Sequence, residues 1–190
     1  MSAWARRSAD MSLLLYKFDS ADDFPVLDSY TTARGVISSH VEDRGDGSVL
    51  RICLARHPDE VPDTVIVLAL PLVAVDGEPE RLELTVHGDG SRCRLSIDAS
   101  DARGIGFSYS FGQVDFMGKR TCRADVCKPD EVWDECQHNH RPQVTPPIQL
   151  LRLRIHFNRS AAQASVGLVA LSVTGNAHRG ASGIAKRKDL

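Results

Sequence analysis

The sequence predicts an all-β fold, an antiparallel β-sandwich of two sheets with jelly-roll topology. Three observations predict it. Apolar and polar residues alternate over many short segments, turn-forming Gly, Asp and Pro residues separate these segments, and no segment carries a helical stripe over three turns. About ten short strands at regular spacing are typical of an antiparallel sandwich or barrel, and the jelly roll is the form that we expect.

Three of the predicted strands show clean alternation: 81–87, 92–98 and 151–157. In 92–98, Cys93 and the other apolar residues point to one face, while Asp98 and the other polar residues point to the opposite face. A half-buried strand requires this pattern, because successive side chains leave opposite sides of a sheet. We therefore expect each of these segments to have one face on the core and one face in water.

The other predicted strands are shorter or less regular, and turn signals bound them. They are 13–18, 34–41, 48–55, 64–70, 104–111, 113–117, 120–126 and 165–173. The predicted turns are 43–47, 76–79, 88–91 and 101–104, which are rich in Gly and Asp. Residues 130–136 are expected to form one helical turn at most.

Composition and periodicity indicate a single globular domain over residues 13–175. The chain has 190 residues, of which 42% are hydrophobic and 25% are charged, so it can build a core. Residues 1–12 and 176–190 lack periodicity, so we expect an N-terminal tail and a flexible basic C-terminal tail.

Charge and hydropathy exclude several classes of partner. A net charge of −2 argues against a nucleic-acid binder, which usually carries a basic excess. No apolar stretch is long enough to span a bilayer, so no membrane partner is predicted. The apolar run that follows Arg6 and Arg7 is too short for a signal peptide, which predicts a cytoplasmic protein unless the chain is a fragment of a larger secreted one. Five cysteines is an odd number, so at least one is unpaired within the chain.

Several short stretches carry a resemblance to a known family. They are Leu15-Tyr-Lys-Phe-Asp19 with Asp22-Asp-Phe24, Leu82-x-Leu-x-Val-x-Gly-Asp-Gly-Ser91, Leu95-x-Ile-Asp-Ala99, Phe107-x-Tyr-x-Phe111, Val114-Asp-Phe116, Pro147-Ile-x-Leu150 and Gly167-Leu-Val-x-Leu-x-Val173. In order and spacing, over about 160 residues, they resemble the galactose-binding-like jelly rolls, and among them the carbohydrate-binding modules of glycoside hydrolases. The resemblance implies a jelly roll that acts as a non-catalytic binding module for a carbohydrate or glycan-like ligand.

The resemblance also implies a structural calcium ion, which such jelly rolls often hold between the first and last strands. Asp19, Asp22 and Asp23 supply carboxylate oxygens near the first strand, and oxygen is the ligand that calcium prefers. The chain departs from the family at Phe116, where such modules often carry a tryptophan, and in the cysteine- and histidine-rich segment described next.

Residues 121–142 hold five side chains that bind metals in other proteins: Cys122, Cys127, Cys136, His138 and His140. Thiolate and imidazole are the ligands that zinc prefers, so a zinc site within 122–140 is one hypothesis. A disulfide from Cys127 to Cys136 is the second, and free thiols with exposed histidines in a polar loop are the third. The spacing contains no Cys-x-x-Cys pair and leaves all three open.

The parity of a strand position predicts whether a cysteine faces the core or the solvent. Cys122 shares its parity with Ala124 and Val126, and Cys93 shares its parity with apolar neighbours, so both are expected in the core. Cys53 lies on the opposite parity from the apolar residues of 48–55, which predicts that it faces outward.

Candidate ligand-binding residues lie in the same segment and on one strand. They are Trp133, His138, His140, Tyr109, Arg152, Arg154 and His156. Trp133 stands among acidic residues and is expected either to cap the sandwich or to form an aromatic binding surface. Arg152, Arg154 and His156 share the outward parity of one strand and offer planar donors, although outward charges also keep a sheet soluble. Tyr109 shares its parity with two phenylalanines, so the core is its alternative location.

No catalytic signature occurs in the chain, which lacks a nucleophile elbow, a phosphate loop and a dinucleotide fingerprint. Asp98 and Asp101 flank a predicted turn and are expected to serve it. Two further functions remain open beside carbohydrate binding: a metal-dependent enzyme that uses the cysteine/histidine segment, and an interaction subunit whose sandwich face binds a partner protein.

Overall fold

The computed structural model describes residues 12–30, 36–45, 47–55, 64–133, 143–157 and 163–180. Strands, turns and loops account for all of these residues, and none of them forms a helix, so none forms a helix that crosses a membrane. The strands are β1 (Ser12–Lys17), β2 (Val26–Tyr30), β3 (Val36–Arg44), β4 (Gly47–Ala55), β5 (Thr64–Asp89), β6 (Cys93–Ser100), β7 (Gly106–Val114), β8 (Met117–Asp125), β9 (Glu131–Trp133), β10 (Ile148–Phe157) and β11 (Gln163–Arg179). The predicted all-β, antiparallel β-sandwich is confirmed.

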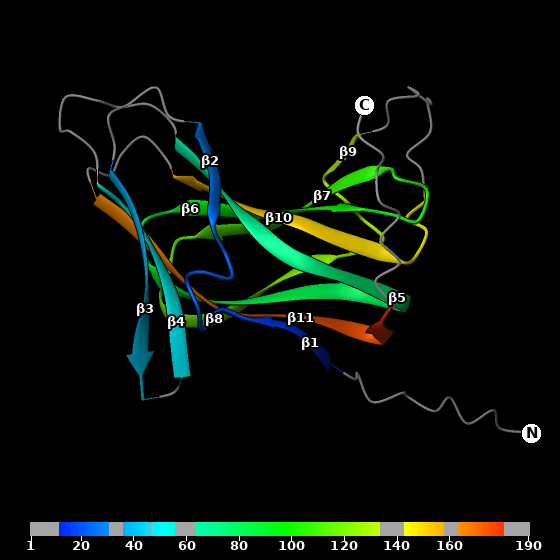
Figure 1. The fold of residues 1–190 in the computed structure, drawn as a ribbon, viewed down its shortest axis with the longest axis horizontal. Helices are drawn as coiled ribbons and strands as arrows, with labels where there is room; N and C mark the ends of the chain where they lie inside the picture. Colours follow the sequence, from blue (N-terminus) through cyan, green and yellow to red (C-terminus); the bar gives the residue numbers. More distant parts are fainter. Residues whose placement is uncertain are drawn as a thin grey trace, which may run out of the picture.

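The strands form two packed layers that share β5. The first layer, which we call the β10 sheet, has the order β2, the first half of β5, β10, β6, β7 and β9. The second, the β11 sheet, joins β8 to the second half of β5 and then to β11, whose other edge pairs with β1 and β4; β3 follows β4. Figure 1 shows β3 and β4 at one end of the molecule and β7 and β9 at the other.

Strand β5 passes from one layer to the other. It pairs with β10 from Thr64 to Val75 and with β11 from Val75 to His87. The predicted turn at 76–79 is therefore wrong, because these residues continue the strand. Gly77 has a φ of 87° and a Cβ there would lie 2.3 Å from the Asn176 carbonyl oxygen, so the glycine allows the close approach of β11 at this bend.

Three other differences concern the ends and edges of strands. The short edge strands β2 and β9 were not predicted, and β9 replaces the expected helical turn at 130–136. The predicted strands 104–111 and 113–117 are divided differently, since β7 runs on to Val114 and β8 begins at Met117. Strand β11 extends to Arg179, so the expected start of the C-terminal tail at 176 lies inside the strand.

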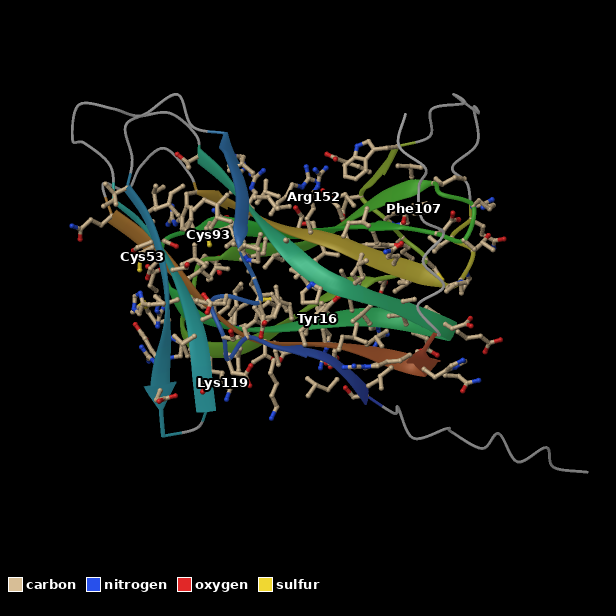
Figure 2. The ribbon with its side chains drawn as sticks, viewed as in Figure 1. Tyr16, Cys53, Cys93, Phe107, Lys119 and Arg152 are labelled. Atoms are coloured by element: carbon tan, nitrogen blue, oxygen red, sulfur yellow. The ribbon has the colours of Figure 1, made fainter. Side chains whose placement is uncertain are left out.

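The core lies between the two sheets and follows from the alternation. Leu153 and Ile155 of β10 point inward from one sheet, and Leu84 of β5 and Leu171 of β11 point inward from the other; all four are fully buried. Each such side chain contributes about 1.5–3 kcal/mol by leaving water. Cys93 lies in the same core, and the partly buried Cys122 packs against the core residues, as predicted for both. Figure 2 shows the side chains on the ribbon.

Candidate functional site

The outer face of the β10 sheet carries a row of charged side chains that the sequence predicted on β10. Arg152, Arg154 and His156 all lie on this face, because the buried Leu153, Ile155 and Phe157 take the inward positions. A β-bulge between Leu150 and Arg152 interrupts the register with both neighbouring strands. Figure 2 shows Arg152 beside β10 in the middle of the molecule.

Asp98 on β6 anchors the two arginines. Its Oδ2 accepts a hydrogen bond from Arg152 Nε at 2.5 Å, and its Oδ1 lies 2.9 Å from Arg154 Nη2. The Asp98 side chain is 1% exposed, whereas those of Arg152 and Arg154 are 43% and 27% exposed. The buried carboxylate therefore holds two partly exposed guanidinium groups at the surface.

The turn role predicted for Asp98 is wrong, whereas that of Asp101 is confirmed. Asp101 Oδ1 accepts hydrogen bonds from the backbone N–H groups of Arg103 and Ile105 in the β6–β7 turn. Asp98 instead lies opposite Arg152 in the β6–β10 ladder. Its outward parity on 92–98 was visible in the sequence, but its partner strand was not.

Trp133 lies beside this arginine pair, on strand β9. The Arg154 Cζ atom is 5.3 Å from the centre of the Trp133 ring, a cation–π contact, and Arg154 Nη2 donates to Ser108 Oγ at 2.8 Å. The cross-strand partner of Trp133 is Gly106, where a Cβ would lie 3.0 Å from Trp133 Cε3. The missing side chain at Gly106 thus makes room for the indole, which remains 39% exposed.

Asp130 fixes the short edge strand that carries Trp133. The Ser110 backbone N–H donates to Asp130 Oδ2 at 2.6 Å, and the Asp130 backbone N–H donates to the Ser108 carbonyl oxygen at 2.9 Å. These bonds lie just beyond the short β7–β9 ladder of Gly106–Ser108 and Glu131–Trp133. They hold Trp133 on a defined strand instead of a loop.

A pocket of about 210 Å³ opens on this face next to Arg154 and His156. Its lining is mostly polar and comes from five strands and the β8–β9 turn: Val65, Arg94, Leu95, Ser96, Ser108, Ser110, Asp130, Glu131, Arg154 and His156. Two arginines, Arg94 and Arg154, and two carboxylates, Asp130 and Glu131, balance in formal charge, so the lining offers donors and acceptors without a strong net potential. We refer to this pocket with Trp133, Asp98 and Arg152 as the Trp133 face.

The structure therefore brings four of the predicted ligand-binding residues together: Trp133, Arg152, Arg154 and His156. Tyr109 is a core residue instead, because it is fully buried and its ring stacks near Phe107 with 6.5 Å between the ring centres. His138 and His140 lie outside the described residues.

The predicted metal ligands lie only partly within the described residues. Cys122 is half-buried on β8 and Cys127 is exposed in the turn that follows, while Cys136, His138 and His140 lie outside the described part. Cys53, Cys93, Cys122 and Cys127 form no disulfide with one another, and the second partner of the hypothesised Cys127–Cys136 disulfide lies outside the described residues. Among the described residues no group of three or more His, Cys, Asp or Glu side chains is placed to hold a metal ion.

The carboxylates of the calcium hypothesis are not gathered into a metal site among the described residues. Asp19, Asp22 and Asp23 all lie in the described segment that follows β1, and they form no such group.

Solved structures with a similar fold are carbohydrate-binding modules. The family 11 module of the cellulosomal cellulase Lic26A-Cel5E of Clostridium thermocellum superposes with a TM-score of 0.55 at 13% sequence identity, over 88% of this chain and 96% of that one. A family 11 module from the same organism, in complex with a β-1,3-1,4-mixed-linked tetrasaccharide, gives 0.56 at 14% identity, over 88% and 98%. The chain has the fold of a carbohydrate-binding module. No protein-family model and no curated protein sequence matches it significantly.

Proposed function

We propose that this chain is a non-catalytic carbohydrate-binding module that binds its glycan on the Trp133 face. The observation that carries the proposal is the contact of an exposed indole with an anchored arginine pair: Trp133 beside Arg154, with Asp98 holding both Arg154 and Arg152. An aromatic ring offers a flat apolar surface for the C–H face of a sugar ring. The guanidinium groups offer planar donors for its hydroxyl oxygens.

The fold supports this class of function without identifying the glycan. At 13–14% identity the similar modules share the architecture of this chain, and one of them is in complex with a β-1,3-1,4-mixed-linked tetrasaccharide. The Trp133 face adds residues of this chain that suit the same kind of ligand. An aromatic platform with a few fixed polar groups in a concave surface is the usual composition of a small-molecule site.

The test is affinity electrophoresis of the full chain in gels that contain a mixed-linked β-1,3-1,4-glucan, followed by a glycan array. We expect the chain to be retarded, and Trp133→Ala to weaken binding at least about tenfold by removing the platform. Arg154→Gln should weaken binding to a smaller extent. Val36→Ala is the matched control, because Val36 is 70% exposed on β3, in the other sheet.

Melting temperatures of the three variants establish that each is folded. Equal retardation of Trp133→Ala and Val36→Ala would remove the Trp133 face as the site. Failure of the unmodified chain to bind any glycan on the array would remove carbohydrate binding itself.

A further inference from the structure

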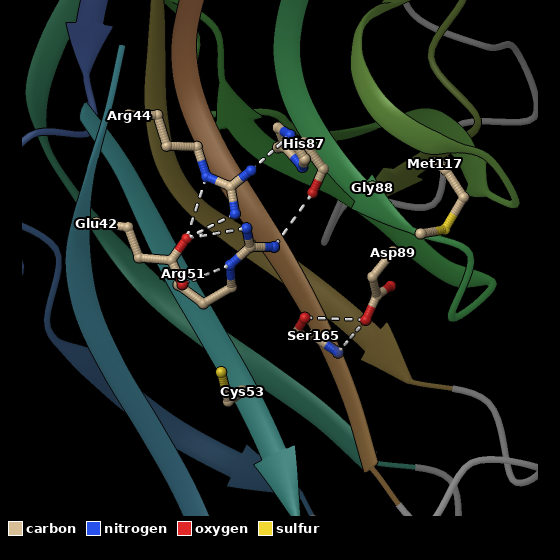
Figure 3. A pocket seen from close by; sticks show the side chains of 9 residues that line it. All are labelled: Glu42, Arg44, Arg51, Cys53, His87, Gly88, Asp89, Met117 and Ser165. Atoms are coloured by element: carbon tan, nitrogen blue, oxygen red, sulfur yellow. Dashed lines mark hydrogen bonds and ion pairs between the residues drawn. The ribbon is translucent and has the colours of Figure 1, made fainter. Parts of the chain in front are cut away.

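A second and larger pocket lies on the outer face of the other layer, the β11 sheet. It has a volume of about 350 Å³, within the range of small-molecule sites. Five strands supply its lining, β3, β4, β5, β8 and β11: Glu42, Arg44, Arg51, Cys53, His87, Gly88, Asp89, Met117 and Ser165. Figure 3 shows these side chains, with Glu42, Arg44 and Arg51 on one side and Asp89, Ser165 and Met117 on the other. We call it the Arg51 pocket.

One wall of the Arg51 pocket holds two guanidinium groups on a single carboxylate. Glu42 Oε2 accepts hydrogen bonds from Arg44 Nη2 at 2.9 Å and from Arg51 Nη2 at 3.1 Å. Hydrogen bonds from Arg51 and Arg44 lower the pKa of Glu42 to about 2, so the carboxylate is ionised at neutral pH. One negative charge faces two positive charges here, which leaves this wall with an excess positive charge.

Arg51 is the nearly buried residue of this wall. Its side chain is 7% exposed, and Gly167 lies between it and His87 in the β4–β11–β5 register. A Cβ at Gly167 would lie 3.3 Å from Arg51 Nη1 and 3.1 Å from His87 Cβ, so any side chain there would crowd the guanidinium. Removing an arginine from water costs free energy unless a partner of opposite charge offsets it. Ionisable groups in such environments are found more often at functional sites than elsewhere.

His87 completes this wall. Arg44 Nη1 lies 2.9 Å from His87 Nε2, and since a guanidinium only donates, Nε2 is the acceptor and the proton of the neutral ring sits on Nδ1. Within the described part of the chain, the buried Nδ1 has no hydrogen-bond partner. A buried polar atom left in this way beside a pocket is uncommon in purely structural networks and points to a binding role.

The opposite wall presents an acceptor. Asp89 Oδ2 accepts from the backbone N–H and the hydroxyl of Ser165 at 2.8 and 2.9 Å. Burial raises the pKa of Asp89, but the hydrogen bonds from Ser91 and Ser165 outweigh it and bring the pKa below its ordinary value. The carboxylate is thus ionised, and its remaining lone pairs can accept from ligand hydroxyls. Met117, which is 76% exposed, adds an apolar rim.

We infer that the Arg51 pocket is a second ligand site, for one sugar residue that carries a carboxylate. The planar donors of Arg44 and Arg51, with their excess charge, suit a carboxylate group. Asp89 and Ser165 on the far wall suit hydroxyl groups of the same ring. The pocket lies on a different sheet from the Trp133 face, so the two sites share no residue.

The test is an NMR titration of the isotopically labelled full chain with D-glucuronate, D-glucose and acetate. We expect glucuronate to shift the amide signals of Gly88, Asp89 and Ser165. Arg44→Gln should weaken this binding at least about tenfold, because it removes a charge-assisted donor. Arg44 is 39% exposed on an edge strand, so the variant should fold, and its melting temperature is the check.

Arg81→Gln is the matched control, an equivalent change at a 50% exposed arginine of β5 that lines neither pocket, and it should leave glucuronate binding unaltered. Glucose should shift these amides at least about tenfold more weakly than glucuronate, since it lacks the carboxylate. The inference is overturned if glucuronate leaves the three amides unshifted or if Arg44→Gln binds it as well as the unmodified chain does. Equal binding of acetate would replace it with a simple carboxylate site, and loss of glucuronate binding in Trp133→Ala but not in Arg44→Gln would move the ligand to the Trp133 face.

Discussion

Asp98 and Arg152 face each other across the β6–β10 ladder, with Asp98 Oδ2 and Arg152 Nε 2.5 Å apart. The aspartate is almost fully buried, and the arginine extends over it to the surface. This pair, with Arg154 on the other carboxylate oxygen, ties the stability of the β10 sheet to the geometry of the Trp133 face. The stability of the sheet and the proposed ligand binding therefore depend on the same charged group.

The first prediction concerns this shared group. Asp98→Asn should destabilise the chain by about 2–3 kcal/mol, because the amide leaves two arginines without their anion; solvent at the arginines keeps the cost below that of a fully buried pair. Urea unfolding measures the loss. Glu131→Gln is the control, with a 61% exposed side chain and an expected change of less than about 0.5 kcal/mol. Similar stabilities for the two variants would contradict the anchoring role of Asp98.

The second prediction concerns the space that Gly106 leaves for Trp133. Gly106→Ala should displace the indole, because the new methyl group would lie 3.0 Å from Trp133 Cε3. In a Trp4→Phe background, which leaves Trp133 as the single tryptophan, the emission maximum should shift and glycan affinity should fall by roughly threefold to tenfold. Ser100→Ala, at the β6 position that pairs with Gly106 of β7, should leave the emission maximum and the glycan affinity unchanged. An unaltered spectrum in Gly106→Ala would show that the ring does not depend on this gap.

The strands and the orientation of their side chains could be predicted from the sequence, because an alternation with a period of two is a local property. It placed Arg152, Arg154 and His156 on one outer face and Cys93 in the core, and both placements are correct. The passage of β5 from one sheet to the other could not be predicted from the sequence. The Asp-Gly-Glu-Pro stretch at 76–79 has the chemistry of a turn, and only the pairing with β11 turns it into a bend within a strand.

The contents of the two pockets depend on which strands are neighbours. Arg51 and Cys53 share an outward parity that is visible in the chain, yet His87 reaches the same pocket from 36 positions beyond Arg51. Asp98 was mistaken for a turn residue for the same reason, since its partner Arg152 is 54 positions away. The local alternation determines on which face of the sheet a side chain lies, whereas the order of the strands determines which residues it contacts.

The third prediction concerns acid. The pKa of Glu42 is lowered from 4.5 to about 2 in the fold, so its interactions stabilise the chain fully above pH 4.5 and are lost as the pH falls towards 2. The melting temperature of Glu42→Gln should therefore lie below that of the unmodified chain at pH 6, and the difference should shrink over this window. Thermal melts between pH 6 and pH 2 measure it. A difference that stays constant down to pH 2 would mean that the Glu42 carboxylate is not selectively stabilised in the fold.

The fourth prediction concerns the thiols. Burial raises the pKa of Cys93 to about 12, and the side chain is fully buried, so almost no reactive thiolate is present at pH 8. Cys127 is exposed, and burial raises the pKa values of the half-buried Cys53 and Cys122. Iodoacetamide should therefore label Cys127 first, Cys53 and Cys122 more slowly, and Cys93 only when urea unfolds the chain.

Peptide mass spectrometry over a time course reads out this order. Complete labelling of all five cysteines in urea is the control that each thiol is detectable and reduced. Labelling of Cys93 in the folded chain at the rate of Cys127 would contradict its position between the two sheets, because a side chain packed at interior density admits no reagent without unfolding. Slow labelling of Cys127 alone would instead indicate that another group protects its thiol.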